Sequence, residues 1–275
     1  MNVIRLSWLC FVTILAVSEV ACRTAQSNPA EQFTEKAAHG APLRPRFKAI
    51  AFDYLVLFNP DSVLPAVERA FPGRGRELIT LWRTRQFEYS WLRSMTGRYV
   101  DFQTITEQAL VYAAAAMKLE LMPEDRQRLV NAYLQLTPWP DTRDALRRLK
   151  ESGVRVIAIS SFSPLMLQSN AEHAGMTGVF DALISTDANH TFKPDPRAYH
   201  LGVERLHLGR QDILFAAFAG WDAAGAKSFG YPTFWVNRFN QPTEELGIRP
   251  DHASTSLDGL LAFVLGEPAP ALERN

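Results

Sequence analysis

Cysteine is almost absent from this chain of 275 residues, which contains only Cys10 and Cys22. Both lie near the start of the chain, so the remainder offers no disulfide and no thiol chemistry. An excess of charge of one sign is also absent, because 29 basic residues balance 29 acidic residues. No net field draws the protein toward nucleic acid or anionic lipid, so a small molecule is the expected partner.

The leader lacks an apolar run long enough to cross a bilayer. Residues 6–17 form a mostly apolar run of 12 residues that follows Arg5, and small residues around Ala25 come next. This arrangement is typical of a cleaved export signal. We therefore expect residues 1–27 to direct export, which places the mature protein in the periplasm or the medium with no stable membrane span.

A second interpretation of the leader is a lipoprotein signal that is cleaved before Cys22, which would then carry the lipid. Glu19 stands where such signals normally have an aliphatic residue, and this favours ordinary cleavage. Residues 28–45 are polar and rich in proline, so they are expected to form a linker. The folded part should begin near Phe47, and residues 266–275 should form a tail.

An apolar run that contains one acid is the most informative feature of the sequence. Residues 47–58 read FKAIAFDYLVLF, without polar alternation, which is typical of a parallel strand covered on both faces. Ligands bind at the carboxyl ends of such strands, and Asp53 falls at that place. Asp53 is therefore a candidate nucleophile.

Later apolar segments alternate with helical patterns. The predicted strands are residues 154–160, 180–185, 212–219 and 232–237. The predicted helices between them are residues 164–174, 197–205 and 222–229. This alternation predicts an α/β fold with a doubly wound, Rossmann-like parallel sheet that includes the strand before Asp53. The core should comprise residues 46–60 and 138–265.

Between the two core segments, apolar residues recur at helical spacing. The helical patterns cover residues 63–71, 74–93 and 104–118. Since residues 61–137 leave the sheet directly after the strand that carries Asp53, we expect a helical cap that excludes water from the active end of the sheet. Its tryptophan and phenylalanine side chains are expected to be core, with a homodimer face as the alternative.

Polar side chains follow the later strands. Ser160 and Ser161 end one strand, and Lys193 and Asp222 follow the next two. Because the carboxyl ends of parallel strands share one edge, these side chains should meet Asp53. Two unit charges about 4 Å apart attract by roughly 4 kcal/mol at an effective dielectric constant of ~20, so the lysine would keep the nucleophile charged in a dry pocket.

The chain resembles the haloacid dehalogenase superfamily, and within it the type II branch, which hydrolyses (S)-2-halo acids without a metal. The resemblance runs from Lys48 to about Phe263. It rests on three long phrases, which are FPGRGRELITLWRTRQFEYSWLRSMTGRY, FKPDPRAY and GWDAAGAKSFGYPTFWVNR.

The resemblance implies a reaction in two steps. Asp53 would attack the carbon that bears the halogen, with inversion, and water would then cleave the resulting ester at the aspartyl carbonyl. Arg83 matches the family arginine that receives the departing halide, where a fixed guanidinium stabilises the developing charge. The resemblance implies no metal or other cofactor.

Other positions match the family residue by residue. Lys193 matches the lysine beside the nucleophile, and Asp222 matches the acid associated with the hydrolytic step. The positions that match substrate-binding or pocket residues are Ser160, Ser161, Tyr199, Phe87, Phe102 and Trp221, with Ser161 in place of an asparagine.

The sequence departs from the family in its active loops. Leu55 and Val56 replace a glycine and a threonine in a loop that is one residue shorter, and Ala217 and Ala219 replace a serine and an asparagine. These changes leave open a catalytically weakened, exported binding protein of the same fold. A phosphatase-like hydrolase with another substrate is a further alternative, but its magnesium would need a second acid at position 55, where leucine supplies no oxygen.

Overall fold

The computed structural model describes residues 45–267 of the chain. The predicted leader, nearly all of the predicted linker and the end of the predicted tail lie outside these residues. Within residues 45–267, no helix is both long enough and apolar enough to cross a membrane.

A six-stranded sheet forms the core, with the strand order β5-β4-β1-β6-β7-β8 and parallel pairing throughout. Its strands are β1 Ala49–Phe52, β4 Arg155–Ser160, β5 Ala182–Ser185, β6 Ile213–Ala217, β7 Thr233–Val236 and β8 His252–Ser254. The predicted doubly wound parallel sheet is confirmed. The sequence did not predict β8, because its three residues carry no apolar pattern.

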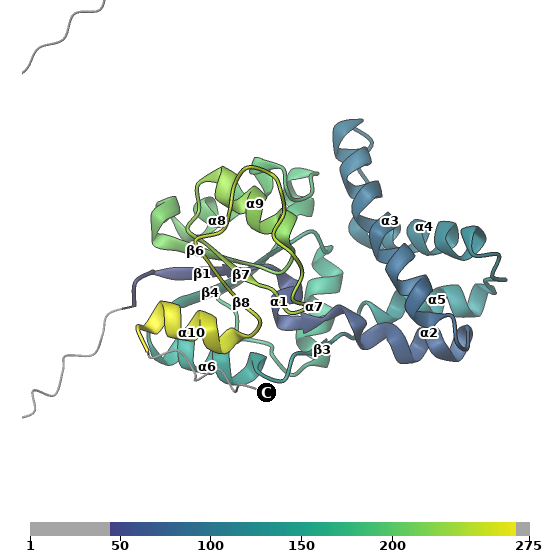
Figure 1. Cartoon of the computed structure of the whole chain (residues 1–275), viewed down its shortest axis with the longest axis horizontal. Helices are drawn as coiled ribbons and strands as arrows, with labels where there is room; N and C mark the ends of the chain where they lie inside the picture. Colours follow the sequence, from purple (N-terminus) through teal and green to yellow (C-terminus); the bar gives the residue numbers. More distant parts are fainter. Residues whose placement is uncertain (1–44, 268–275) are drawn as a thin grey trace, which may run out of the picture. The chain divides into compact units, whose positions relative to one another are not determined.

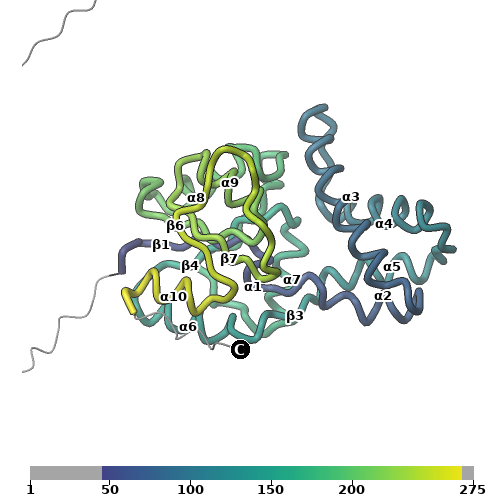
Figure 2. The backbone as a smooth tube through the Cα atoms, viewed as in Figure 1, coloured from purple at the N-terminus to yellow at the C-terminus, as the bar shows by residue number. Residues whose placement is uncertain are grey.

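Helices cover both faces of this sheet (Figures 1 and 2). The core helices are α6 Thr142–Glu151, α7 Pro164–His173, α8 Pro196–Leu206, α9 Gly220–Phe229 and α10 Leu257–Leu265. Ile50 and Phe52 of β1 pack in the hydrophobic cluster that includes α6, α7 and α10, whereas Ala49 and Ala51 pack in the cluster of α8 and α9. Burial on both faces explains why the β1 sequence shows no polar alternation.

The apolar run of residues 47–58 is not one continuous strand. β1 ends at Phe52, and the short helix α1, Tyr54–Leu57, follows. Asp53 caps this helix, since its Oδ1 accepts the backbone N–H of Leu55 at 2.8 Å. The cap fixes the carboxylate at the point where the chain changes direction.

Residues 61–137, here called the helical insertion, separate the two parts of the core. Its helices are α2 Leu64–Ala70, α3 Gly75–Met95, α4 Phe102–Ala116 and α5 Pro123–Ala132. The chain leaves the core through β2 Phe58–Asn59 and returns through β3 Thr137–Pro138, and these two short strands pair antiparallel. Short 3₁₀ helices occupy Pro60–Val63, Thr186–Asn189 and Arg210–Asp212.

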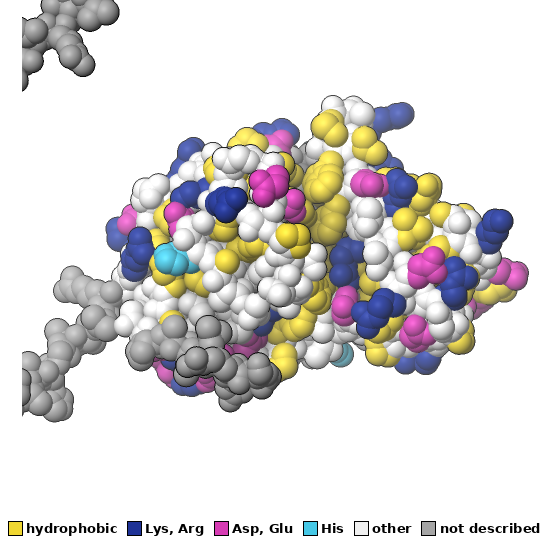
Figure 3. All heavy atoms as spheres, viewed as in Figure 1, with side chains coloured by type: hydrophobic (Ala, Val, Ile, Leu, Met, Phe, Trp, Pro, Cys, Tyr) yellow, Lys and Arg dark blue, Asp and Glu magenta, His cyan; other side chains and the backbone are white. Residues whose placement is uncertain are grey.

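The aromatic side chains of the helical insertion are buried or partly buried, except that of Tyr112. Trp82 and Phe102 are buried and belong to the same hydrophobic cluster as the core residues. Figure 3 shows apolar side chains on α3 and in the hollow between α3 and the core. The large apolar side chains of α3 and α4 that are exposed are Leu92, Met95, Val111 and Tyr112.

Candidate active site

Asp53 stands at the carboxyl end of the central strand. Its backbone N–H donates to the carbonyl of Ala216 on β6 at 2.8 Å, and its Oδ1 accepts from the N–H of Leu55. The neighbouring strands β4 and β6 end beside it, as expected for a parallel sheet. Backbone from two elements therefore fixes both the position and the orientation of this carboxylate.

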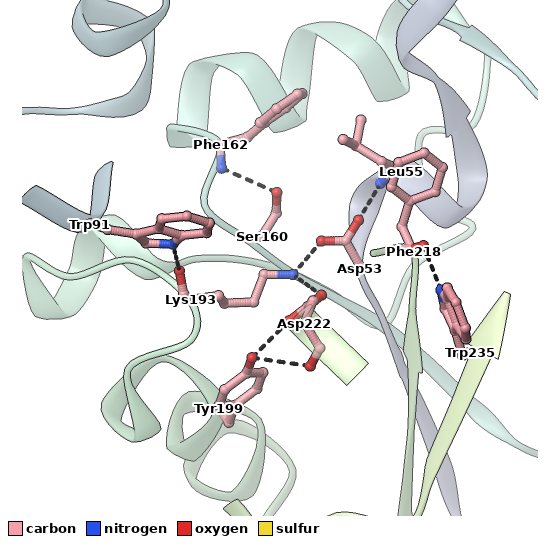
Figure 4. Close-up of polar contacts among 10 residues, drawn as sticks. All are labelled: Asp53, Leu55, Trp91, Ser160, Phe162, Lys193, Tyr199, Phe218, Asp222 and Trp235. Carbon is pink, nitrogen blue, oxygen red and sulfur yellow. Dashed lines mark hydrogen bonds and ion pairs between the residues drawn. The ribbon is translucent and has the colours of Figure 1, made fainter. Parts of the chain in front are cut away.

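Lys193 reaches Asp53 from the loop after β5, as the sequence predicted. Its ammonium group pairs with Oδ2 of Asp53 and with Oδ2 of Asp222, the latter at 2.7 Å (Figure 4). The lysine side chain is only 1% exposed. A buried ammonium between two carboxylates leaves one net negative charge in the group.

The pKa values of Lys193 and Asp222 follow from this arrangement. Burial acts to lower the pKa of Lys193, but the charges and hydrogen bonds of Asp222 and Asp53 outweigh it and raise the pKa above its usual range. Burial raises the pKa of Asp222 to about 6, although Lys193 opposes the shift. Asp222 therefore takes up a proton in mildly acidic solution.

Tyr199 supports Asp222 from behind. Its hydroxyl donates to Oδ1 of Asp222 at 2.7 Å. Burial, with the nearby charge of Asp222, raises the pKa of Tyr199 well above its usual range, so the phenol remains a donor. The structure therefore places Tyr199 against the acid rather than at the wall of the cavity.

A narrow cavity of about 30 Å³ lies beside these groups. Of the predicted site residues, those that line it are Asp53, Arg83, Phe87, Phe102, Ser160, Ser161, Lys193, Trp221 and Asp222. Ser160 is buried at the end of β4, and its Oγ accepts the N–H of Phe162 at 3.1 Å. This free volume is sufficient for a water molecule and leaves little room for a bulky ligand.

Arg83 of α3 approaches the cavity from the helical insertion. Its Nη2 donates to Oδ1 of Asp61 at 2.7 Å, an ion pair that the sequence did not predict. The Arg83 side chain is 20% exposed, and its buried Nε has no hydrogen-bond partner within residues 45–267. Asp61 therefore orients the guanidinium at the wall of the cavity.

Aromatic rings join the helical insertion to the core beside the cavity. The ring centroid of Trp221 lies 5.2 Å from that of Phe87 and 5.4 Å from that of Trp91, and both pairs are edge-on. The indole N–H of Trp91 also donates to the carbonyl of Lys193 at 3.2 Å. Trp91 was not predicted as a site residue, although it lies one helical turn after Phe87 on the same face of α3.

Other residues of the cavity wall were also missed. They are Pro60, Gln86, Tyr133, Phe162 and Phe218, together with Leu55 and Ala219, which the sequence identified only as departures from the family. Gln86 donates to Thr106 at 2.9 Å and accepts from the Tyr133 hydroxyl at 3.3 Å. Gln86 stands three residues after Arg83, so helical spacing could have identified it.

The available oxygen ligands are few. Asp222 is engaged by Lys193 and Tyr199, and position 55 presents a leucine side chain. In the part of the chain that the structure describes, no group of three or more His, Cys, Asp or Glu side chains is placed to hold a metal ion. The donor set therefore does not match the oxygen cage that magnesium prefers.

Comparison with known proteins identifies the family. The model of haloacid dehalogenase-like hydrolases matches residues 47–230. An (S)-2-haloacid dehalogenase of Pseudomonas sp. (strain YL) is 45% identical over 211 residues, which cover 76% of this chain and 91% of that protein. Haloacetate dehalogenase H-2 of Moraxella sp. (strain B) is 39% identical over 220 residues, 80% of this chain and 98% of that protein.

A solved structure supports the same family. The L-2-haloacid dehalogenase from Xanthobacter autotrophicus has a TM-score of 0.74 and 36% identity, over 78% of this chain and 96% of that one. That enzyme has also been solved with chloropropionic acid covalently bound. The resemblance predicted from the three sequence phrases is confirmed, and the chain belongs to the haloacid dehalogenase-like hydrolase family.

Proposed function

We propose that this protein hydrolyses the carbon–halogen bond of small (S)-2-haloalkanoic acids through an ester on Asp53, without a metal. One observation supports this most strongly: the Asp53 carboxylate lines a narrow cavity while a buried lysine pairs with it. Each oxygen of this carboxylate accepts one bond, from Leu55 or from Lys193, and keeps a lone pair for attack on carbon. The three relatives named above carry dehalogenase names, and these agree with the geometry.

In the first step, an oxygen of Asp53 attacks C2 of the substrate from the side opposite the halogen. The new C–O bond forms as the C–X bond breaks, and the halogen leaves with the bonding electrons as halide. Arg83 lines the same cavity, where Asp61 holds its guanidinium. A fixed guanidinium there stabilises charge that develops only in the transition state.

In the second step, water attacks the carbonyl carbon of the Asp53 ester. The substrate leaves as a 2-hydroxy acid that carries an oxygen from Asp53, and the carboxylate regains an oxygen from water. Asp222 lines the cavity and has a raised pKa of about 6, so it is suited to accept the proton of the attacking water. Lys193 retains its charge beside the tetrahedral intermediate and stabilises it.

The cavity favours acids of short chain. Its free volume is about 30 Å³, and its apolar wall includes Phe87, Phe102 and Trp221. Ser160 ends β4 and Ser161 follows it, and both line the cavity, which supports a role in binding the substrate carboxylate. We propose that the helical insertion acts as the cap, because its aromatic rings close the cavity against water.

Halide release tests this proposal. The wild-type protein and Asp53→Asn are compared on (S)- and (R)-2-chloropropionate, and halide and 2-hydroxy acid are measured. We expect release from the (S) acid by the wild type alone. Equal release by the two proteins would reject the role of Asp53.

Heavy-oxygen water then distinguishes the ester from direct attack by water. Under single-turnover conditions, the label should enter Asp53 and not the product, and mass spectrometry of the peptide that contains Asp53 detects it. Label in the first molecule of product would exclude the aspartyl ester. Tight binding of the substrate without any halide release would instead support the alternative of a binding protein.

For the leader we propose export, on the basis of its sequence alone. The pattern of Arg5, a short apolar run and small residues supports a signal at residues 1–27. The mass of the mature protein recovered from a periplasmic extract tests this. A mass that corresponds to lipid-modified Cys22 would support the lipoprotein alternative, and a full-length chain would reject both.

A homodimer is proposed from the surface of the helical insertion. Four exposed apolar side chains on α3 and α4 support it, namely Leu92, Met95, Val111 and Tyr112. Sedimentation of the wild type and of Leu92→Lys tests the proposal. A monomer at all concentrations would reject it.

A further inference from the structure

The helix that follows Asp53 is held in place by bonds from distant parts of the chain. A helix as short as α1 cannot satisfy its last carbonyl groups internally, so other groups must bond them. The indole N–H of Trp139 donates to the carbonyl of Leu55 at 3.0 Å. Arg238 donates through Nη2 to the carbonyl of Val56 at 2.9 Å. The carbonyl of Leu57 accepts from the backbone N–H of Trp139 at 3.0 Å.

Arg238 is itself fixed on several sides. Its guanidinium makes two bonds to the carboxylate of Asp141, at 2.6 and 2.9 Å, and its side chain is 6% exposed. Asp141 also accepts the backbone N–H of Leu257 at 2.9 Å. The guanidinium lies 5.0 Å from the ring centre of Trp139. A planar group with these contacts has little freedom to move away from Val56.

This pair is connected to the nucleophile through α1. Arg238 bonds the carbonyl of Val56, and the N–H of the preceding residue, Leu55, bonds Oδ1 of Asp53. The orientation of the carboxylate therefore depends on where α1 lies. That dependence is strong in this chain, because positions 55 and 56 are apolar and supply no side-chain hydroxyl to orient the acid.

We propose that Arg238, fixed by Asp141, is a positioning residue for the nucleophile. It touches neither the cavity nor the reacting atoms, and it acts by holding α1 so that the Leu55 N–H aims the Asp53 carboxylate. The inference rests on the proposed role of Asp53 in ester formation. Arg238 thereby joins the residues on which the first chemical step depends, although it lies far from residues 61–137 in the sequence.

A purely structural role for the same ion pair predicts different behaviour. A buried ion pair can often be replaced by apolar side chains without loss of stability, whereas removal of one partner leaves a charge without compensation. The double variant Arg238→Met/Asp141→Leu therefore separates the two roles. It should fold without an uncompensated charge, although it loses the acceptor of the Leu257 N–H, and it lacks the bond to the carbonyl of Val56.

The experiment measures ester formation by single-turnover halide release from (S)-2-chloropropionate, together with thermal unfolding. We expect the rate to fall by about 10- to 100-fold in Arg238→Met and in the double variant, because small displacements of a reacting group have effects of this size. The substrate concentration at half-maximal rate should change little, since Arg238 does not contact the substrate. A wild-type rate in the stable double variant would overturn the proposal.

Two further variants complete the design. Arg238→Lys keeps the charge next to Asp141, but a lysine cannot bond that carboxylate and the Val56 carbonyl in the fork geometry of arginine. We expect it to recover stability and not the rate, and full recovery of the rate would contradict the proposal. Arg155→Met is the matched control, because Arg155 also donates to a backbone carbonyl, that of Leu206 at 2.9 Å, at the opposite end of β4. Its rate should equal that of the wild type.

Amide hydrogen exchange distinguishes failure of this inference from failure of the proposed function. If the wild type releases no halide, the proposed function fails, but exchange in residues 54–58 still reports on α1. Arg238→Met should then exchange faster than the wild type in that segment, with no change in Arg155→Met. Equal exchange in Arg238→Met and the wild type would overturn the positioning role whatever the activity.

Discussion

The two sides of the cavity are built in different ways. On the core side, Asp53, Lys193 and Asp222 form a buried chain of charge-assisted contacts that start from strand ends and loops of one sheet. On the side of the helical insertion, aromatic rings and one arginine with a single carboxylate partner form the wall. The core side therefore fixes the Asp53 carboxylate by charged contacts, while the opposite side contributes mainly apolar surface to the cavity.

Removal of the lysine should have the largest effect. Lys193→Met leaves two carboxylates without a cation in a buried site, so turnover should fall by about 100-fold or more, and the free energy of unfolding by about 3–5 kcal/mol. Halide release and denaturant unfolding measure the two effects. Lys227→Met is the control, since its pair with Asp251 at 2.6 Å is partly exposed and should contribute only about 0–1 kcal/mol. Similar losses of turnover and of stability in both variants would contradict the distinction between the core side of the cavity and the protein surface.

The arginine on the opposite wall should affect turnover and leave the fold intact. Arg83→Ala removes the proposed halide partner, and we expect a loss of about 100-fold in kcat with an unchanged unfolding midpoint. Arg85→Ala is the control on the same helix, because Arg85 pairs with Glu88 and lies over Tyr112 on the surface of the insertion. If the two variants lose the same activity, Arg83 has no special role at the cavity.

The pH dependence sharpens the comparison because Asp222 belongs to the core side. Its pKa is raised from 3.8 to about 6, so the folded protein binds this proton more tightly than the unfolded chain does. The linked stability is present below pH 4 and is lost as the pH rises through about 6, a change on the order of 2–3 kcal/mol. Turnover should move in the opposite direction, since protonated Asp222 cannot accept a proton from water.

Unfolding and halide release between pH 4 and 8 measure these two trends. The side chain in Asp222→Asn cannot ionise, so the free energy of unfolding of this variant should lose the change between pH 4 and 6. Retention of that change in the variant would assign it to another group.

The smallest effect is expected from the indole contacts. Trp91→Phe removes the bond to the Lys193 carbonyl but keeps a ring near Trp221, so stability should fall by about 0.5–1.5 kcal/mol and KM should rise slightly. Trp235→Phe removes a comparable bond, to the carbonyl of Phe218 at 3.0 Å, on the core side of the cavity. A larger change of KM in the core variant would contradict the assignment of access to the insertion wall.

Strand ends were the part of the site that the sequence could predict. Parallel strands deliver their carboxyl ends to one edge, so Ser160, Lys193 and Asp222 could be placed beside Asp53 from chain order alone. The predicted sheet required only apolar runs separated by helical patterns. Both inferences depend on local sequence and on one rule of topology.

Contacts between side chains of different elements could not be predicted. The pairing of Arg83 with Asp61 depends on packing within the helical insertion, and that of Arg238 with Asp141 depends on packing within the core. Polar residues of these types are common on surfaces. The split of residues 47–58 into β1 and α1 also escaped prediction, because the helix is stabilised by a side-chain cap and by distant donors rather than by its own pattern.

The antiparallel pairing of β2 with β3 has a consequence for how such proteins diversify. Phe58 lies opposite Pro138 and Asn59 opposite Thr137, so the outgoing and returning chains stand side by side where the insertion joins the core. A module that enters and exits through neighbouring residues can be exchanged for another without rethreading the sheet. The same nucleophile could therefore be presented to a different class of substrate by grafting a new set of helices between Asn59 and Thr137.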